Sequence, residues 1–93
     1  MVVEFVKRFK KELKNTPIDV QKRVLGVIEK LETAQTLEAS GIDYKKMEGQ
    51  KSDESYFRIR VGEWRIGIEY LHPNIVLLRL LSRGDIYKHF PPR

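Results

Sequence analysis

The residues from Tyr56 to Tyr87 constrain the fold more than any other part of the chain, because they contain three strand patterns in succession. Residues 56–61 and 64–70 alternate apolar and polar side chains, the period-two pattern of strands with one buried face. A glycine–glutamate turn separates these runs, and a histidine–proline–asparagine turn follows the second. The third run, residues 75–81, is more continuously apolar, as in a strand covered on both faces. The stretch therefore predicts three consecutive antiparallel strands.

Arginine side chains share one face of this predicted sheet. In the first run the alternation places Arg58 and Arg60 opposite the apolar residues, and in the second run it does the same for Arg65. Arg83 follows directly after the third run and is expected on the same face. Four guanidinium groups that converge repel one another unless an anion lies among them. We therefore predict that this face binds an anion.

Two amphipathic helices are expected before the sheet. From residue 6 to about residue 14, apolar side chains recur at four-residue spacing, and five lysines and arginines occupy the remaining surface. A second helix then runs to about residue 33, with Thr16 as N-cap, Pro17 at the first helical position and Asp19 completing a capping box. So short a connection between helices predicts a hairpin.

Short segments at the two ends complete the predicted α+β fold. The β-branched run Val2–Phe5 is expected to add a strand at the sheet edge, and residues 88–93, which contain two prolines, form a short tail. At 93 residues the chain has the length of one domain. We predict a single domain, residues 1–93, in which an N-terminal strand and a two-helix hairpin pack on an antiparallel sheet of about four strands.

Composition narrows the classes of function. The chain has no cysteine and two histidines, so neither a disulfide framework nor a metal cluster built on these residues is expected, and no cofactor is predicted. No secretory signal or membrane-length apolar run is present, so a cytoplasmic protein without membrane contact is expected. Residues 56–93 hold 7 Lys/Arg against 3 Asp/Glu, whereas residues 1–55 hold 11 against 10. This concentration of positive charge indicates a polyanionic partner, either nucleic acid or an acidic protein segment.

The order of these elements and three local motifs resemble the RelE/ParE superfamily of toxins from type II toxin–antitoxin modules. The motifs are Lys45-Lys46-Met47-Glu48-Gly49, Tyr56-Phe57-Arg58-Ile59-Arg60-Val61-Gly62-Glu63-Trp64-Arg65-Ile66 and Ser82-Arg83-Gly84-Asp85-Ile86-Tyr87. The resemblance spans nearly the whole chain, and the three motifs occur in the family's order and spacing. One departure is Ser82, where many members carry a histidine.

The resemblance implies a metal-independent endoribonuclease that enters the ribosomal A site, cleaves messenger RNA there and so inhibits translation. The family's basic catalytic positions fall on Arg58, Arg60, Arg65 and Arg83, and its terminal tyrosine falls on Tyr87. A carboxylate used by some relatives corresponds to Glu63. Four further cations are expected to contact RNA: Lys45, Lys46, Arg79 and Lys88.

These residue types suit RNA cleavage by the ribose 2′-hydroxyl. A guanidinium group stays charged and binds phosphate oxygens in pairs, which stabilises the charge of the transition state. Structural alternatives remain open at three positions: an ion pair between Arg65 and Glu69, packing of Tyr87 on the sheet end, and a turn role for Glu63.

The implied partners are a cognate antitoxin, in a hetero-oligomer, and the ribosome with its messenger RNA. An antitoxin segment that folds on this surface is expected to be acidic or amphipathic. Two other functions share the same sequence features. One is a poison of DNA gyrase, as in the ParE branch, and the other is a binding module whose basic face holds an acidic peptide without catalysis.

Overall fold

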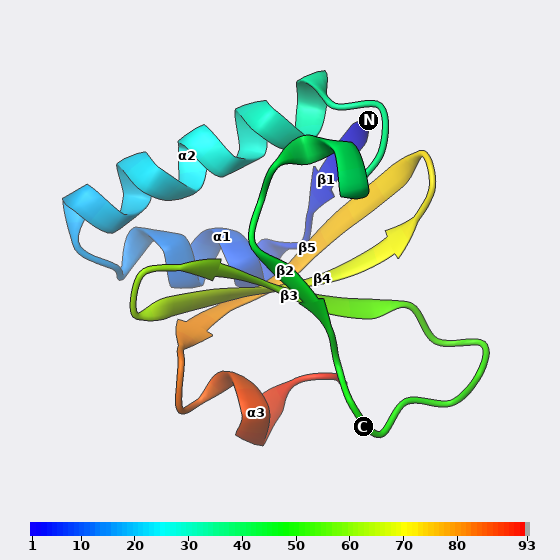
Figure 1. Cartoon of the computed structure of the whole chain (residues 1–93). Coiled ribbons are helices and arrows are strands. Elements are labelled where there is room, and N and C mark those ends of the chain that lie inside the picture. Colours follow the sequence, from blue (N-terminus) through cyan, green and yellow to red (C-terminus); the bar gives the residue numbers. More distant parts are fainter. Residues whose placement is uncertain (93) are drawn as a thin grey trace.

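The computed structural model describes residues 1–92, so Arg93, the last residue of the expected tail, lies outside the described residues. The elements in chain order are β1 (Val2–Phe5), α1 (Lys7–Lys14), α2 (Ile18–Thr33), the 3-10 helix η1 (Glu38–Ser40), β2 (Tyr44–Lys46), β3 (Tyr56–Val61), β4 (Trp64–Leu71), β5 (Asn74–Ser82) and α3 (Ile86–His89). The α+β class predicted from the sequence is confirmed (Figure 1).

The sheet has five strands in the order β1-β5-β4-β3-β2. β3, β4 and β5 pair antiparallel as predicted, and the β3–β4 turn uses Gly62 at a φ of 60°. Two details differ from the prediction of about four antiparallel strands. β1 pairs with β5 in parallel, which requires a long connection between the two strands. Helices α1 and α2 form part of that connection. β2 is an additional strand that the sequence did not predict, because its charged residues show no strand pattern. It pairs with β3 through backbone groups.

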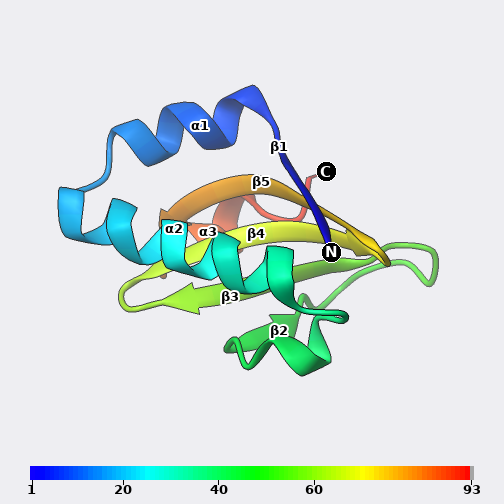
Figure 2. The same cartoon turned by 90° about the horizontal axis from the view of Figure 1, so that it is seen from above.

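Helices α1 and α2 cover one face of the sheet and run across it in roughly opposite directions (Figures 1 and 2). The apolar face of α2 packs into the core through Val20, Val24, Ile28 and Leu31, whereas Leu25 is 53% exposed. Phe9 anchors α1 in the same cluster. No helix among residues 1–92 is long and apolar enough to cross a membrane.

The predicted capping box at the start of α2 is wrong. Thr16 does not cap this helix: its Oγ1 donates a hydrogen bond to the carbonyl of Leu13, at 2.7 Å, and so closes the end of α1. The N-cap position of α2 is Pro17, without a side-chain hydrogen bond. The reason is that Thr16 is buried at the junction of the two helices, where its hydroxyl and its amide both donate to the Leu13 carbonyl in the last turn of α1.

The opposite face of the sheet carries a smaller apolar cluster beneath α3. Met47, Ile86 and Phe90 are buried in it, and Leu78 and Leu81 of β5 pack against them. Leu78 alternates with Leu77, which packs in the main core, and so lies on this face; a register shift between β4 and β5 falls beside it, at Gly67 and Ile68. The cluster covers only part of the face and leaves the β3 side beside it for polar side chains.

Candidate active site

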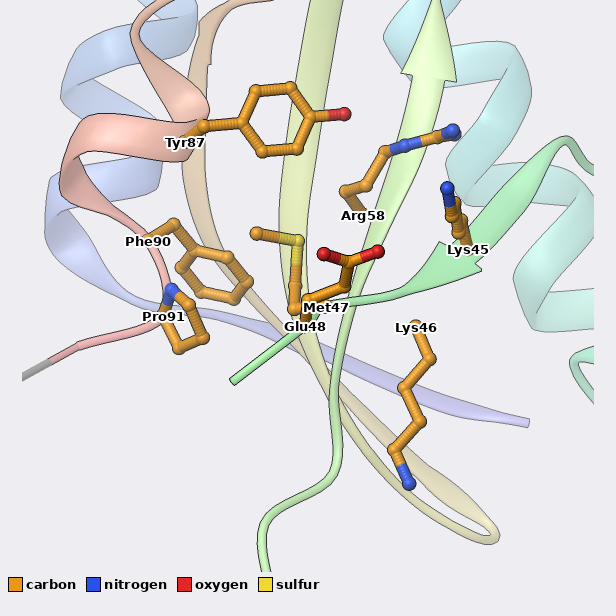
Figure 3. A pocket seen from close by; sticks show the side chains of 8 residues that line it. All are labelled: Lys45, Lys46, Met47, Glu48, Arg58, Tyr87, Phe90 and Pro91. Carbon is orange, nitrogen blue, oxygen red and sulfur yellow. The ribbon is translucent and has the colours of Figure 1, made fainter. Parts of the chain in front are cut away.

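A pocket of about 370 Å³ lies on this second face, between β3, the end of β2 and the C-terminal segment. Its lining residues are Lys45, Lys46, Met47, Glu48, Arg58, Tyr87, Phe90 and Pro91. We refer to it as the Arg58 pocket. Figure 3 shows Arg58 and Tyr87 entering it from opposite sides. The structure thus brings together four of the residues predicted from the sequence, two from β2, one from β3 and one from α3.

Arg58 is the least exposed cation of the pocket, with a side chain that is 15% exposed. Its register partners are Lys45 on β2 and Gly67 on β4. Asp43 lies 3.5 Å from Nη1, but the geometry forms no hydrogen bond, and Nε and Nη1 are buried without any hydrogen-bond partner among the described residues. Buried donors without partners are costly, and more so when charged. An anion in the pocket would supply the missing acceptors.

Lys45 and Glu48 place opposite charges beside Arg58. Lys45 lies directly across from Arg58, a pairing of like charges that is unfavourable without a counterion. Figure 3 shows the Glu48 carboxylate near the centre of the pocket and the Lys45 amine on the same side as the Arg58 guanidinium, whereas Lys46 lines the rim with its amine directed away. Gln50 fixes this wall by donating to the carbonyls of Met47 and Tyr56, at 2.6 and 2.7 Å.

Tyr87 is held at the pocket by the packing of its neighbours, not by its own burial. Its side chain is 60% exposed, while Ile86 and Phe90 on either side of it are buried. Phe90 lies on Gly67, where a Cβ would come within 2.9 Å of the ring. Because Gly67 has no side chain, the Phe90 ring packs directly on β4. This contact determines how closely α3 approaches the sheet.

The remaining predicted arginines lie outside the pocket, toward the β3–β4 turn. Arg60 is exposed and directly opposite Arg65. The Arg65 Nη1 donates to the carbonyls of Gly62 and Trp64, at 2.7 and 2.9 Å, and its Nε is buried without a partner. The alternative ion pair between Arg65 and Glu69 is not among those formed by residues 1–92.

Glu63 and Arg83 form an ion pair at the same end of the sheet. The Arg83 Nε lies 3.2 Å from the carboxylate, and the two side chains are 69% and 74% exposed for Arg83 and Glu63. The Arg83 amide also donates to the Glu63 carbonyl, at 2.9 Å. The pair therefore fastens the segment after β5 to the β3–β4 turn and leaves both charges accessible to a ligand.

Arg79 and Lys88, the other predicted RNA contacts, line a separate hollow beyond Tyr87. Arg79 is bound by Glu12 of α1, whose carboxylate accepts from Nη2 at 2.9 Å and from the Leu80 amide at 2.9 Å. This carboxylate occupies the β5 edge beyond the end of β1. The ion pair favours a structural role for Arg79.

Sequence reasoning missed the side chains that shape the pocket. Met47 and Phe90 form walls, and Asp43 is the ion-pair partner of Arg58. The available signal was Gly67, a glycine inside a strand, which marks close approach of another group. Nothing local identified Phe90 as that group, because its position depends on the turn after β5.

Tyr56 is a further tyrosine at the edge of this site. Its ring meets Phe90 edge-on, with centroids 5.5 Å apart. Burial, and after it the negative charges of Glu69, Glu54 and Asp53, raise the pKa of Tyr56 above its ordinary value. Its hydroxyl therefore stays a hydrogen-bond donor at neutral pH. Among residues 1–92 no three His, Asp or Glu side chains are grouped to hold a metal ion.

Comparison with known proteins identifies the relatives of this chain. No family model matches it. It is 41% identical to toxin RelE3 of Methanocaldococcus jannaschii over 91 residues, which cover 98% of this chain and all of that toxin.

Solved structures support the same relationship. The toxin fold of the RelB-RelE antitoxin–toxin complex from Methanococcus jannaschii matches with a TM-score of 0.77 and 39% identity, over 95% of this chain and 99% of that one. The RelE-RelB complex from Pyrococcus horikoshii matches with a TM-score of 0.69 and 27% identity, over 89% and 94%. With this identity over nearly its full length, the chain belongs to the RelE family of toxins.

Proposed function

We propose that this protein is the toxin of a type II toxin–antitoxin module and that it cleaves messenger RNA in the ribosomal A site without a metal ion. Membership of the RelE family supports the toxin role. The solved relatives are complexes of RelE with RelB, and on this basis we propose a cognate antitoxin that binds the chain in a hetero-oligomer.

The observation that carries the nuclease proposal is the environment of Arg58. The Arg58 guanidinium, whose Nε and Nη1 have no hydrogen-bond partner among the described residues and whose ion pair is with the exposed Asp43 at 3.5 Å, lines a pocket that also receives Lys45 and Tyr87. Such a group is suited to a phosphate, because the phosphate oxygens accept the two free N–H groups and offset the repulsion from Lys45. A gyrase-binding surface would not require these donors, whereas the carboxylates of an acidic peptide could also accept from them, so the assay of RNA cleavage separates the nuclease from a peptide-binding module.

In the proposed reaction the ribose 2′-oxygen forms a bond to the adjacent phosphorus and the bond from phosphorus to the 5′-oxygen breaks. The products are a 2′,3′-cyclic phosphate and a 5′-hydroxyl, and one proton leaves the 2′-hydroxyl while another reaches the 5′-oxygen. Arg58 and Lys45 hold the nonbridging oxygens and stabilise the added negative charge. Tyr87 exchanges protons from the other wall of the pocket.

The second group of arginines is proposed to hold the RNA on either side of the scissile phosphate. Arg60 and Arg65 continue the positive face of Arg58 along β3 and β4, and Arg83 extends it beyond β5. Glu63, which the family resemblance suggested as a proton acceptor, lies with Arg83 at the turn and not in the Arg58 pocket. We therefore propose that Glu63 orients Arg83.

Primer extension on a translating messenger RNA tests the proposal. The wild-type protein is expected to produce new ends within A-site codons, with a 5′-hydroxyl on the downstream fragment as the proposed reaction requires. Arg58→Ala should abolish them, because the phosphate loses its main charged contact. Lys30→Ala removes the same charge from the exposed surface of α2 and should cleave like the wild type.

Two results would contradict the nuclease proposal. Growth arrest in cells without new RNA ends, and with broken DNA, would favour a gyrase poison. Neither arrest nor cleavage, with the antitoxin still bound, would favour a binding module.

A further inference from the structure

The reaction proposed for the Arg58 pocket requires a group that removes the proton from the ribose 2′-hydroxyl. Glu63, the carboxylate that the family resemblance suggested, is paired with Arg83 and does not line the pocket. Asp43 is paired with Arg58 and does not line it either. The proton acceptor must therefore be sought among the side chains that do line the pocket.

One carboxylate meets this condition. Glu48 follows β2 directly, and Figure 3 shows its carboxylate near the centre of the pocket. Glu48 takes part in none of the ion pairs formed by residues 1–92, although Lys45, Lys46 and Arg58 line the same pocket. A ligand in the pocket therefore meets a carboxylate whose oxygens are not held by a salt bridge.

The backbone around Glu48 is fixed on both sides. The Met47 amide donates to the Tyr56 carbonyl, at 3.0 Å, and the Met47 carbonyl accepts from Gln50 Nε2, at 2.6 Å. Met47 itself is buried in the apolar cluster beneath α3. Gly49 turns the chain directly after Glu48 at a φ of 74°, in the left-handed region that favours glycine. These contacts hold the backbone of Glu48 at the pocket, although its side chain is exposed.

The other polar side chains of the pocket are poorly suited to accept a proton. An arginine stays protonated in proteins, and lysine and tyrosine ordinarily keep their protons at neutral pH. A glutamate is ordinarily ionised at that pH and can accept one. Among the described residues that line the pocket, Glu48 is the only one of this kind, since the other charged or phenolic side chains are Lys45, Lys46, Arg58 and Tyr87.

We propose that Glu48 accepts the proton of the 2′-hydroxyl, which leaves Tyr87 to protonate the 5′-oxygen. This inference rests on the proposed nuclease function. The O–H bond of the 2′-hydroxyl breaks as its oxygen attacks phosphorus, and the proton passes to the Glu48 carboxylate. The 5′-oxygen departs with the proton of the Tyr87 phenol. Glutamic acid and tyrosinate then return to their starting forms by exchange with water.

Single-turnover cleavage of ribosome-bound messenger RNA tests this division of roles, at the linkage that primer extension maps. One messenger RNA has the ordinary 5′-oxygen at this linkage. A second has a bridging 5′-sulfur, which leaves as a thiolate without a proton donor because thiols are far more acidic than alcohols.

The two variants should respond differently to the sulfur. Glu48→Gln keeps the size of the side chain and should cleave both RNAs at least about 100-fold more slowly than the wild type, the lower end of the usual contribution of a general base. Tyr87→Phe should be slow on the oxygen RNA and close to the wild type on the sulfur RNA. Glu29→Gln removes an exposed carboxylate from α2 and should cleave like the wild type.

Binding separates a role in proton transfer from a structural one. Affinity for ribosomes that carry an uncut messenger RNA, with a 2′-O-methyl group at the cleaved residue, should not weaken in Glu48→Gln, because loss of a negative charge favours an anion. Three results would overturn the role of Glu48 while the nuclease proposal stands: wild-type cleavage by Glu48→Gln, its recovery on the sulfur RNA, or a loss of binding as large as the loss of rate. No cleavage of either RNA by the wild type would overturn the proposed function as well.

Discussion

Replacement of Gly67 by alanine tests how the tail shapes the Arg58 pocket. A Cβ at Gly67 would lie 2.9 Å from three ring atoms of Phe90, closer than van der Waals contact allows. The ring cannot easily retreat, because Phe90 is only 3% exposed and packs against Met47 and Ile86. The substitution must therefore deform the sheet or lift the tail.

The expected cost follows from overpacking. Adding a methyl group to a well-packed site costs about 1–3 kcal/mol. In a domain of this size each kcal/mol lowers the melting temperature by about 4–8 °C, so the expected decrease is roughly 4–24 °C. If the tail lifts, Tyr87 moves with it, and RNA binding at the Arg58 pocket should fall together with stability.

Thermal unfolding followed by circular dichroism measures this effect. Gly26→Ala is the matched control, because Gly26 lies in α2 with nothing within 4 Å of its Cβ position. That change should stabilise the protein by up to about 1 kcal/mol, the difference in helix propensity. The same Gly67→Ala substitution is then made in a Phe90→Leu background, which removes the ring atoms that clash.

The reasoning predicts that Gly67→Ala costs much less in the Phe90→Leu background than in the wild type. An equal cost in both backgrounds would refute contact with Phe90 as the cause. It would place the cost in the backbone of β4 instead.

Three further predictions concern charges and one tyrosine. Glu12→Gln should destabilise the protein by up to about 3 kcal/mol in urea unfolding, because Arg79 keeps its largely buried charge and loses its partner; replacing Arg79 by glutamine as well should recover most of the loss, since the glutamine carbonyl at position 12 still accepts from the Leu80 amide. Glu63→Gln should change the free energy of unfolding by less than about 1 kcal/mol, since its pair with Arg83 is exposed, and a larger loss would show that the pair holds the fold. The pKa of Tyr56, followed by NMR of ¹³C-labelled tyrosine, should lie above the ordinary value of about 10, so its contribution to stability is present below pH 10 and is lost as the pH rises through the folded-state pKa; a value at or below 10 would contradict the burial argument.

Local patterns in the sequence predicted the centre of the sheet. The alternation in β3 and β4 assigned each side chain to a face, because strand periodicity depends only on the order of residues. The same patterns placed Arg58, Arg60 and Arg65 on one face of the sheet. The catalytic roles of these arginines stay predictions until cleavage is measured.

Features that depend on contacts distant in sequence were predicted less well. β2 has three residues, two of them lysines, and becomes a strand because β3 offers its backbone groups. The Thr16 hydroxyl could hydrogen-bond either the end of α1 or the start of α2. In the folded chain it donates to a carbonyl at the end of α1. Local sequence contains no information on which of these competing partners lies nearer.

The sequence by itself determined the α+β class, the three central strands and the positive charge of one sheet face, because periodicity and charge are properties of neighbouring residues. Only the tertiary structure decided which cations share a pocket. It brought Lys45 and Tyr87 to Arg58, assigned Arg79 to Glu12, and seated Phe90 on Gly67. These choices arise from packing between segments far apart in the chain, where burial and the need to pair each polar group select one arrangement.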